Sequence, residues 1–430
     1  MLDAVLATDA GSVEPLDVTV EHGQRAVFCG LTSIVWLHRK IQDAFFLVVG
    51  SRTCAHLIQS AAGVMIFAEP RFATAVLEDR DLAGMADCVE EVERVIGQVI
   101  KRRPNLKTIF LVGSCPSEVI KLDLDNIARK FRERQNGQLR VVAYSGSGIE
   151  TTFTQGEDSC LSNLVPDMPQ APGSEAKLLV VGSLPDIVED QFARLFAEMG
   201  VERVEFYPGR QSEHLPSIGA GTRVLLAQPY LGETARALVA RGATLLQAPY
   251  PFGAQGTLAW FRAAAEAFDI AAERFQDCTR APFERAMRSL EAYKGELAGR
   301  RIAFLPDSQL EIPLARFLAR ECGMIPTEVA TPYYDVMTMA CETPLLPEGV
   351  QWYEGQNLDD SLARVRHSRP DLTVCGLGIA NPLEAEGLRT KWSIELMFSP
   401  IQGFDQAGDL AELFARPLRR KSRLEVGAWS

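Results

Sequence analysis

The chain has 430 residues, a formal net charge of −12 and 23% charged residues. That length predicts two or three domains of roughly 100–200 residues, and the composition is that of an ordinary globular protein. No basic patch stands out, so we expect no nucleic-acid partner. No run approaches the ~18 apolar residues of a membrane-spanning helix, so we expect no membrane span.

Nine cysteines are irregularly spaced in this long chain, and its first residues lack the charged and apolar regions of a secretory signal. Such a pattern predicts free thiols in a reducing compartment rather than a disulfide framework. We therefore expect a cytoplasmic protein whose thiolates are available to bind metal.

After residues 1–22, which we expect to form a loose acidic arm, short apolar runs alternate with amphipathic stretches. Continuous apolar runs are typical of strands that are buried on both faces of a parallel sheet. In the first part of the chain, the pattern predicts strands at 45–49, 108–112 and 140–144 and helices at 34–41, 82–101 and 117–134.

A Pro-rich polar stretch at 165–174 predicts a linker, after which the alternation restarts. The later strands are predicted at 177–181, 203–206, 223–227, 244–247, 301–305, 327–330 and 372–375, and the later helices at 282–297, 392–397 and 407–414. The sequence thus predicts an α/β protein of three Rossmann-like, doubly wound parallel-sheet domains, over residues 1–165, 166–297 and 298–430.

Three cysteines share one pattern, because Cys29, Cys54 and Cys115 each follow a short apolar run and precede an amphipathic one. Ligands of open parallel sheets gather at the carboxyl ends of the strands, so we expect these side chains at one sheet edge. Each also lies near a predicted helix N-terminus, where the helix dipole lowers a thiol pKa. Three converging thiolates fit a zinc site or an iron–sulfur cluster.

A fourth ligand is missing from this domain. Cys88 and Cys160 fall on predicted helices away from the edge, and Cys375 ends a strand of the third domain. Water, substrate or a second chain would complete the site. The alternative is that all three cysteines are small residues buried at strand ends, since free cysteine is among the most buried residue types. We expect His38 and His56 on helix surfaces.

The run Gly113–Ser117 also resembles the strand–nucleophile–helix elbow of hydrolases. In that geometry the residue after the nucleophile donates its N–H to the oxyanion, and Pro116 has none. The hydrolase interpretation is therefore disfavoured, whereas Pro116 suits the first turn of a helix. No P-loop pattern G-x-x-x-x-G-K-[ST] occurs, so we expect no ATP hydrolysis through such a loop.

Three aromatic residues are candidates for a substrate pocket. Phe28 adjoins Cys29, where it would either face a flat apolar substrate or pack in the core. Trp392 and Phe398, on the last domain's predicted helical run, are likewise either core or pocket wall.

At these residues the chain resembles the N subunits of the light-independent (dark-operative) protochlorophyllide reductases, a nitrogenase-like family. The likeness continues into the third domain and implies the fold of nitrogenase component 1. It is carried by the runs Phe28–Thr32, Trp36–Phe46, Gly50–His56, Gly113–Ile120, Gly148–Asp158, Cys375–Gly378 and Thr390–Trp392.

The resemblance implies a catalytic-component subunit that pairs with a B subunit in an N2B2 heterotetramer. Each pair would share one [4Fe–4S] cluster, with Cys29, Cys54 and Cys115 from this chain and an aspartate from B. Phe28 and Trp392 would line an apolar protochlorophyllide pocket beside the cluster. The proton donors are expected on the B subunit and on the substrate's own propionate, so no catalytic residue is assigned here.

The resemblance also implies that a separate L-protein dimer docks transiently, binds MgATP and delivers electrons. The ring-D C17=C18 double bond of protochlorophyllide would then be reduced to give chlorophyllide a, in chlorophyll and bacteriochlorophyll synthesis. Two related alternatives are chlorophyllide reductase, which reduces ring B, and a non-enzymatic scaffold for nitrogenase-cofactor assembly. The runs 36–42 and 152–158 favour the protochlorophyllide enzyme over both.

Overall fold

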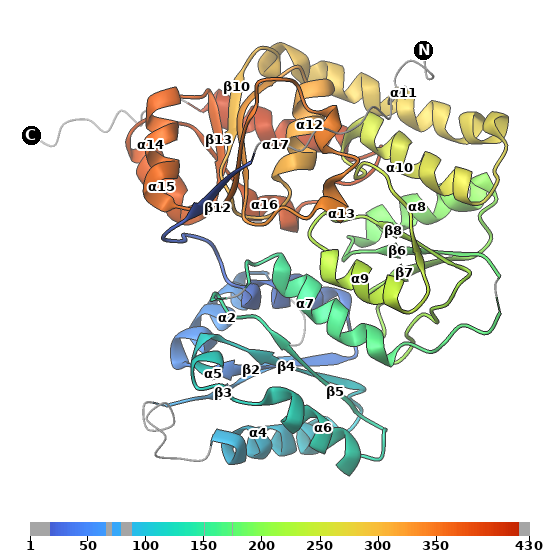
Figure 1. Cartoon of the computed structure of the whole chain (residues 1–430), viewed down its shortest axis with the longest axis vertical. Coiled ribbons are helices and arrows are strands. Elements are labelled where there is room, and N and C mark those ends of the chain that lie inside the picture. Colours follow the sequence, from blue (N-terminus) through green and yellow to red (C-terminus); the bar gives the residue numbers. More distant parts are fainter. Residues whose placement is uncertain (1–17, 66–70, 79–87, 150, 174, 421–430) are drawn as a thin grey trace, which may run out of the picture.

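The computed structural model describes residues 18–65, 71–78, 88–149, 151–173 and 175–420. The chain forms three α/β domains, each built on its own sheet (Figure 1). Every pairing between named strands is parallel. The predicted architecture of three parallel-sheet α/β domains is therefore confirmed.

The first sheet has the order β3-β2-β4-β5. Its two central strands are buried along their whole length, which explains their uninterrupted apolar sequences. The strands are β2 (Ala44–Gly50), β3 (Phe72–Val76), β4 (Thr108–Gly113) and β5 (Arg140–Ser145), and the helices are α1 (Ile34–Lys40), α2 (Arg52–Met65), α4 (Cys88–Arg102), α5 (Cys115–Val119), α6 (Leu124–Arg134) and α7 (Gln155–Leu164). In Figure 1, α4 and α6 cover one face, and α2 and α7 lie on the other side.

The second sheet has the order β7-β6-β8-β9. Its strands are β6 (Lys177–Val181), β7 (Val204–Tyr207), β8 (Thr222–Leu226) and β9 (Thr244–Leu245). Its helices are α8 (Asp186–Met199), α9 (Gly232–Ala240), α10 (Gly253–Ala267) and α11 (Ala272–Leu297).

The third sheet has six strands in the order β1-β12-β11-β10-β13-β14. They are β1 (Thr19–His22), β10 (Arg301–Phe304), β11 (Ile325–Thr331), β12 (Gln351–Gln356), β13 (Leu372–Cys375) and β14 (Thr390–Trp392). The helices of this part are α12 (Glu311–Arg320), α13 (Val336–Met339), α14 (Leu358–Ser368), α15 (Leu377–Ala385), α16 (Ser393–Phe398) and α17 (Ala407–Arg419).

The expected loose arm is wrong for residues 19–22, because β1 pairs with the edge strand β12 of the third sheet. An edge strand presents unpaired N–H and C=O groups that another strand can satisfy. The Arg364 guanidinium adds ion pairs to Glu21 and to Glu328. The rest of the expected arm, residues 1–17, lies outside the described part of the chain.

Two predicted helices have different bounds in the structure. The stretch 117–134 forms two helices, since Lys121 adopts a φ of 53° and the Asp123 side chain caps α6 by accepting from Asn126 N at 2.9 Å. Helix α11 begins at Ala272, so Pro282 lies inside it rather than at its start. The first residues of the helix predicted at 82–101 lie outside the described residues, and α4 begins at Cys88.

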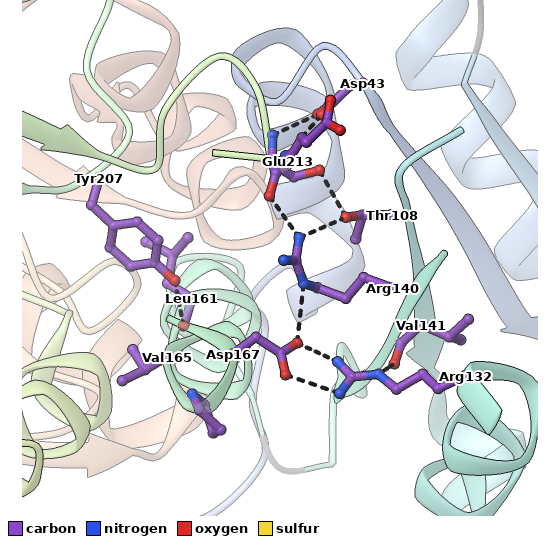
Figure 2. Close-up of polar contacts among 12 residues, drawn as sticks. Asp43, Thr108, Arg132, Arg140, Val141, Leu161, Val165, Asp167, Tyr207 and Glu213 are labelled. Carbon is purple, nitrogen blue, oxygen red and sulfur yellow. Dashed lines mark hydrogen bonds and ion pairs between the residues drawn. The ribbon is translucent and has the colours of Figure 1, made fainter. Parts of the chain in front are cut away.

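Polar contacts join the first two domains (Figure 2). Arg132 donates to the Asp167 carboxylate, and Arg140 Nη1 donates to the Ser212 carbonyl at 2.6 Å. Asp43 Oδ1 accepts from Ser212 N at 2.7 Å. Asp167 lies within the predicted linker, so that stretch contributes to this contact between domains.

The last helices tie the third domain to the other two. Arg419 of α17 forms an ion pair with Glu296 of α11, and Phe252 and Gln402 form an antiparallel bridge. Phe398 of α16 meets the Trp36 ring of α1 edge-on, with centroids 5.9 Å apart. Residues of α16 therefore lie against the same domain that carries the three candidate cysteines.

Candidate functional site

Cys54 and Cys115 lie at the carboxyl ends of neighbouring strands, as predicted. Cys54 is in the first turn of α2, directly after β2, and Cys115 is the first residue of α5, directly after β4. The two strands are paired in register up to Val49 and Gly113. Ser114 Oγ donates to the Val49 carbonyl at 2.6 Å and so fixes one turn to the other.

Cys29 reaches the same edge by a different route. From residue 18, where the described part of the chain begins, no strand of the first sheet precedes it, and its backbone forms an isolated antiparallel bridge with Thr152. The prediction of a buried strand before Cys29 is therefore wrong. The segment comes from β1 of the third sheet, and Leu31 N donates to the Gly146 carbonyl at 3.0 Å.

The loop after β5 brings Cys29 and Cys115 together. A Cβ placed on Gly148 would lie 3.1 Å from Cys29 Cβ, which is a tight contact, and 3.8 Å from Cys115 Sγ, which is an ordinary one. Gly148 N also donates to Cys115 Sγ at 3.3 Å. Ser51 Oγ lies 3.4 Å from Cys54 Sγ. Serine and main-chain donors therefore face two of the three sulfur atoms.

The electrostatics of Cys29 differ from the prediction. Burial raises the pKa of its thiol above the ordinary value, the Leu31 N–H opposes this rise, and the nearby Cys115 and Cys54 add to it. The predicted lowering by a helix N-terminus is wrong for Cys29, because desolvation outweighs the effect of a short 3₁₀ turn. Cys54 and Cys115 therefore both lie near enough to Cys29 to influence its charge.

The donor set fits an iron–sulfur cluster. Three free thiols lie at this edge, one of them accepts from a main-chain N–H, and such hydrogen bonds to sulfur tune clusters. Among the residues that the structure describes, no three His, Cys, Asp or Glu side chains are close enough to hold one metal ion.

An apolar cavity of about 460 Å³ adjoins this edge. It lies between the first and third domains, and all three aromatic residues that the sequence singled out as pocket candidates line it. Its lining residues are Phe28, Thr32, Val35, Leu57, Ile58, Leu377, Trp392, Ile394, Glu395, Phe398 and Ser399. Trp392 ends β14 rather than lying within a helix, which corrects the predicted helical run at its first residue.

Among the described residues that line the cavity, one has a charged side chain. The Glu395 carboxylate accepts from Lys391 Nζ and lies 3.7 Å from Arg416 Nη1. Lys391 is buried, and desolvation lowers the pKa of its ammonium group. The rest of the wall is predominantly hydrocarbon and aromatic, which suits a largely apolar ligand.

Comparison with known proteins agrees with this geometry. Residues 29–419 match the family described as nitrogenase component 1 type oxidoreductase. The chain belongs to this family. Within it, the chain is 63% identical over 406 residues to the light-independent protochlorophyllide reductase subunit N of Halorhodospira halophila, covering 94% of this chain and 96% of that protein. The subunit N of Rhodopseudomonas palustris is 61% identical over 408 residues and covers 95% of each chain.

Nitrogenase component 1 type oxidoreductases also provide the structural match. The solved structure titled "Nitrogenase Cp1 at pH 6.5" has a TM-score of 0.74 and covers 97% of this chain and 96% of that one. The sequences are only 16% identical, so this likeness shows the fold alone. Among the described residues, no helix has the length and apolar character needed to cross a membrane.

The other sequence candidates lie elsewhere in the nitrogenase-type fold. Cys160 is buried in α7, Cys375 is buried at the end of β13, and Cys88 begins α4. His56 is exposed, as predicted. His38 is buried instead, and its Nε2 accepts from Arg71 N at 2.9 Å, so the expectation of a surface histidine is wrong.

Sequence reasoning missed several cavity residues, among them Leu57, Ile58 and Leu377. Leu57 lies one helical turn after Cys54, so an i, i+3 pattern along α2 would have placed it near the cysteine. Leu377 had no such signal. It reaches the cavity only because the third domain packs over the first.

Proposed function

We propose that this chain supplies three cysteine ligands and part of the substrate wall in an ATP-dependent protochlorophyllide reductase. The reaction would reduce the ring-D C17=C18 double bond to give chlorophyllide a in chlorophyll or bacteriochlorophyll synthesis. One observation carries the proposal: Cys29, Cys54 and Cys115 meet at a sheet edge that adjoins an apolar cavity lined by Phe28 and Trp392.

In this proposal Cys29, Cys54 and Cys115 hold a [4Fe–4S] cluster that relays single electrons to the substrate. The fourth ligand, an aspartate, comes from a B subunit within an N2B2 heterotetramer. Two observations support a partner at this position. Among the described residues none offers a fourth thiolate here, and the apolar side chains of Val119 and Ile149 are exposed beside the edge.

The chain's own residues would bind and orient the substrate. Phe28 and Trp392 present aromatic surface to the cavity, which suits a flat tetrapyrrole. The apolar wall excludes water from the reacting double bond. Protons are assigned to the B subunit and the substrate propionate, and electrons to a transiently docked L-protein dimer that hydrolyses MgATP. We place the complex in the cytoplasm, because free thiol ligands require a reducing compartment.

The test is anaerobic co-purification with the B-type partner, followed by iron and sulfide analysis and absorption and EPR spectra. We expect about four irons and four sulfides per pair of subunits, since one cluster is shared. With the L-type partner and MgATP, the complex should reduce ring D of protochlorophyllide. Reduction of ring B of chlorophyllide instead would assign the chlorophyllide enzyme. A larger bound cluster without turnover would assign an assembly scaffold.

A further inference from the structure

Glu157 is a buried carboxylate between the first and second domains. It lies in the first turn of α7 and has no exposed surface. Its Oε2 accepts from Trp36 Nε1 at 2.6 Å and from Tyr230 OH at 2.9 Å, and its Oε1 accepts from Ser183 N at 2.8 Å. Tyr230 and Ser183 belong to the second domain, so this carboxylate joins that domain to the first.

Trp36 also packs against a residue of the cavity wall. Its ring meets Phe398 edge-on at 5.9 Å and Phe153 edge-on at 6.4 Å. Phe398 ends α16 of the third domain and lines the cavity. The Trp36 N–H therefore points at Glu157 while its ring supports the cavity wall from behind.

The chemistry of Glu157 suggests more than packing. Burial raises the pKa of its carboxyl, and the hydrogen bonds from Ser183, Trp36 and Tyr230 oppose this rise. A buried carboxyl group is costly unless its hydrogen bonds are made, so all three donors are held to a narrow geometry. A hydrogen bond at its N–H restrains the orientation of the buried Trp36 ring, and with it the edge that this ring offers to Phe398.

We propose that Glu157 is a positioning residue that sets the substrate wall through the pair Trp36 and Phe398. This inference rests on the proposed function, because it assigns the cavity to protochlorophyllide. Glu157 does not touch the cavity itself.

The test compares Trp36→Phe, Glu157→Gln and Tyr230→Phe in the anaerobic complex with its partner. Trp36→Phe removes the N–H donor, and Glu157→Gln replaces one acceptor oxygen by an NH₂ group. Tyr230→Phe is the matched control, since it removes another donor to the same Oε2 but has no contact with Phe398. We expect Kd and KM for protochlorophyllide to rise about 5-fold in the first two variants, with kcat and iron content unchanged. The control should stay within about 2-fold.

A double variant tests the coupling directly. If Glu157 acts through Trp36, Glu157→Gln combined with Trp36→Phe should bind substrate no more weakly than the worse single variant. Ultraviolet resonance Raman spectra give a readout independent of substrate: the band of a strongly hydrogen-bonded indole N–H should be lost in Trp36→Phe, weakened in Glu157→Gln and kept in Tyr230→Phe.

The outcomes separate the two proposals. A wild-type complex that neither binds nor reduces protochlorophyllide would overturn the proposed function, whatever the Raman spectra show. A competent wild-type complex whose Glu157→Gln and Trp36→Phe variants keep the wild-type Kd would overturn the positioning role alone. Equal weakening by Tyr230→Phe would also overturn it, because Glu157 would then act only on the contact between domains.

Discussion

At the carboxyl edge of the first sheet three thiols lie half-buried beside exposed apolar side chains, whereas the polar groups at the carboxyl edge of the third sheet are sealed inside the protein. Val119 and Ile149 keep 69% and 53% of their surface exposed at the first edge. At the third edge Asp307 and Glu311 are buried. Both edges belong to parallel sheets, so sheet architecture alone does not explain the difference.

The difference in burial comes from the chain segments that cover each edge. In the third sheet the strand order reverses between β10 and β13, which is where open α/β sheets usually bind ligands. Here the chain's own segment fills that crevice: a Cβ on Gly376 would meet Asp307 Oδ1 at 2.8 Å and the Ala26 carbonyl at 3.2 Å. The same segment continues to Cys29. One edge is thus closed by the residues that build the other.

The largest expected effect is the loss of the cluster at the carboxyl edge of the first sheet. Cys54→Ser should lower the iron and sulfide content of the anaerobic complex and reduce turnover by more than about 100-fold, because a cluster ligand is lost. Cys278→Ser, on α11 in the second domain, is the control and should leave both unchanged. Full cluster content in Cys54→Ser would remove the distinction between the two edges.

At the carboxyl edge of the third sheet, buried Asp307 should make the stability of the protein depend on pH. Burial raises the pKa of Asp307 from 3.8 to about 7, opposed by the hydrogen bond from Ser393 and increased by Glu311. The folded state therefore binds a proton that the unfolded state releases, so Asp307 costs stability as pH rises from about 4 to about 7. The cost is fully present above pH 7.

Asp307→Asn removes this titration. Its stability relative to wild type should rise between pH 5 and pH 8 by at most about 3 kcal/mol, because the cost grows by about 1.4 kcal/mol per pH unit from pH 5 up to the raised pKa of about 7. Urea unfolding at each pH measures the change, and exposed Asp277→Asn controls for the loss of one charge. Parallel stability curves for Asp307→Asn and wild type would show that Asp307 is not held as an uncharged acid.

A matched pair of glycine substitutions compares the two edges directly. Gly376→Ala forces a methyl group against Asp307 and Ala26, so the free energy of unfolding should fall by about 1–3 kcal/mol. Gly148→Ala meets Cys29 Cβ at 3.1 Å at an edge that can still adjust, and it should instead lower iron content with little loss of stability. Urea unfolding measures the stability of both variants, and iron analysis measures their cluster content. The reverse pattern would contradict the comparison.

The smallest expected effects concern the cavity wall. Phe28→Leu and Trp392→Leu each keep an apolar side chain but remove an aromatic face. We expect Kd for protochlorophyllide to rise about 2- to 10-fold, since an aromatic contact contributes about 0.5–1.5 kcal/mol beyond its buried area. Trp352→Leu, at a half-buried tryptophan outside the cavity, is the control. Unchanged Kd in both cavity variants would show that these residues belong to the core.

Much of the fold followed from local pattern. Strands such as β2 and β4 are buried on both faces, so their sequences are continuously apolar and could be recognised. Strand β1 could not be recognised in this way, because Thr19–His22 is largely polar. It forms a strand by pairing with the edge strand β12, which lies more than 300 residues later in the chain. His38 was misjudged for the same reason: its partner, the Arg71 N–H, comes from another part of the chain.

From the sequence alone one could predict three α/β domains and the positions of Cys54 and Cys115 at strand ends, because strand, turn and helix are encoded within a few neighbouring residues. The tertiary structure was needed to show how Cys29 reaches that edge, which side chains enclose the cavity and how Glu157 joins Trp36 to the second domain. Those features depend on domain packing, where burial and hydrogen bonding between distant residues outweigh local preference.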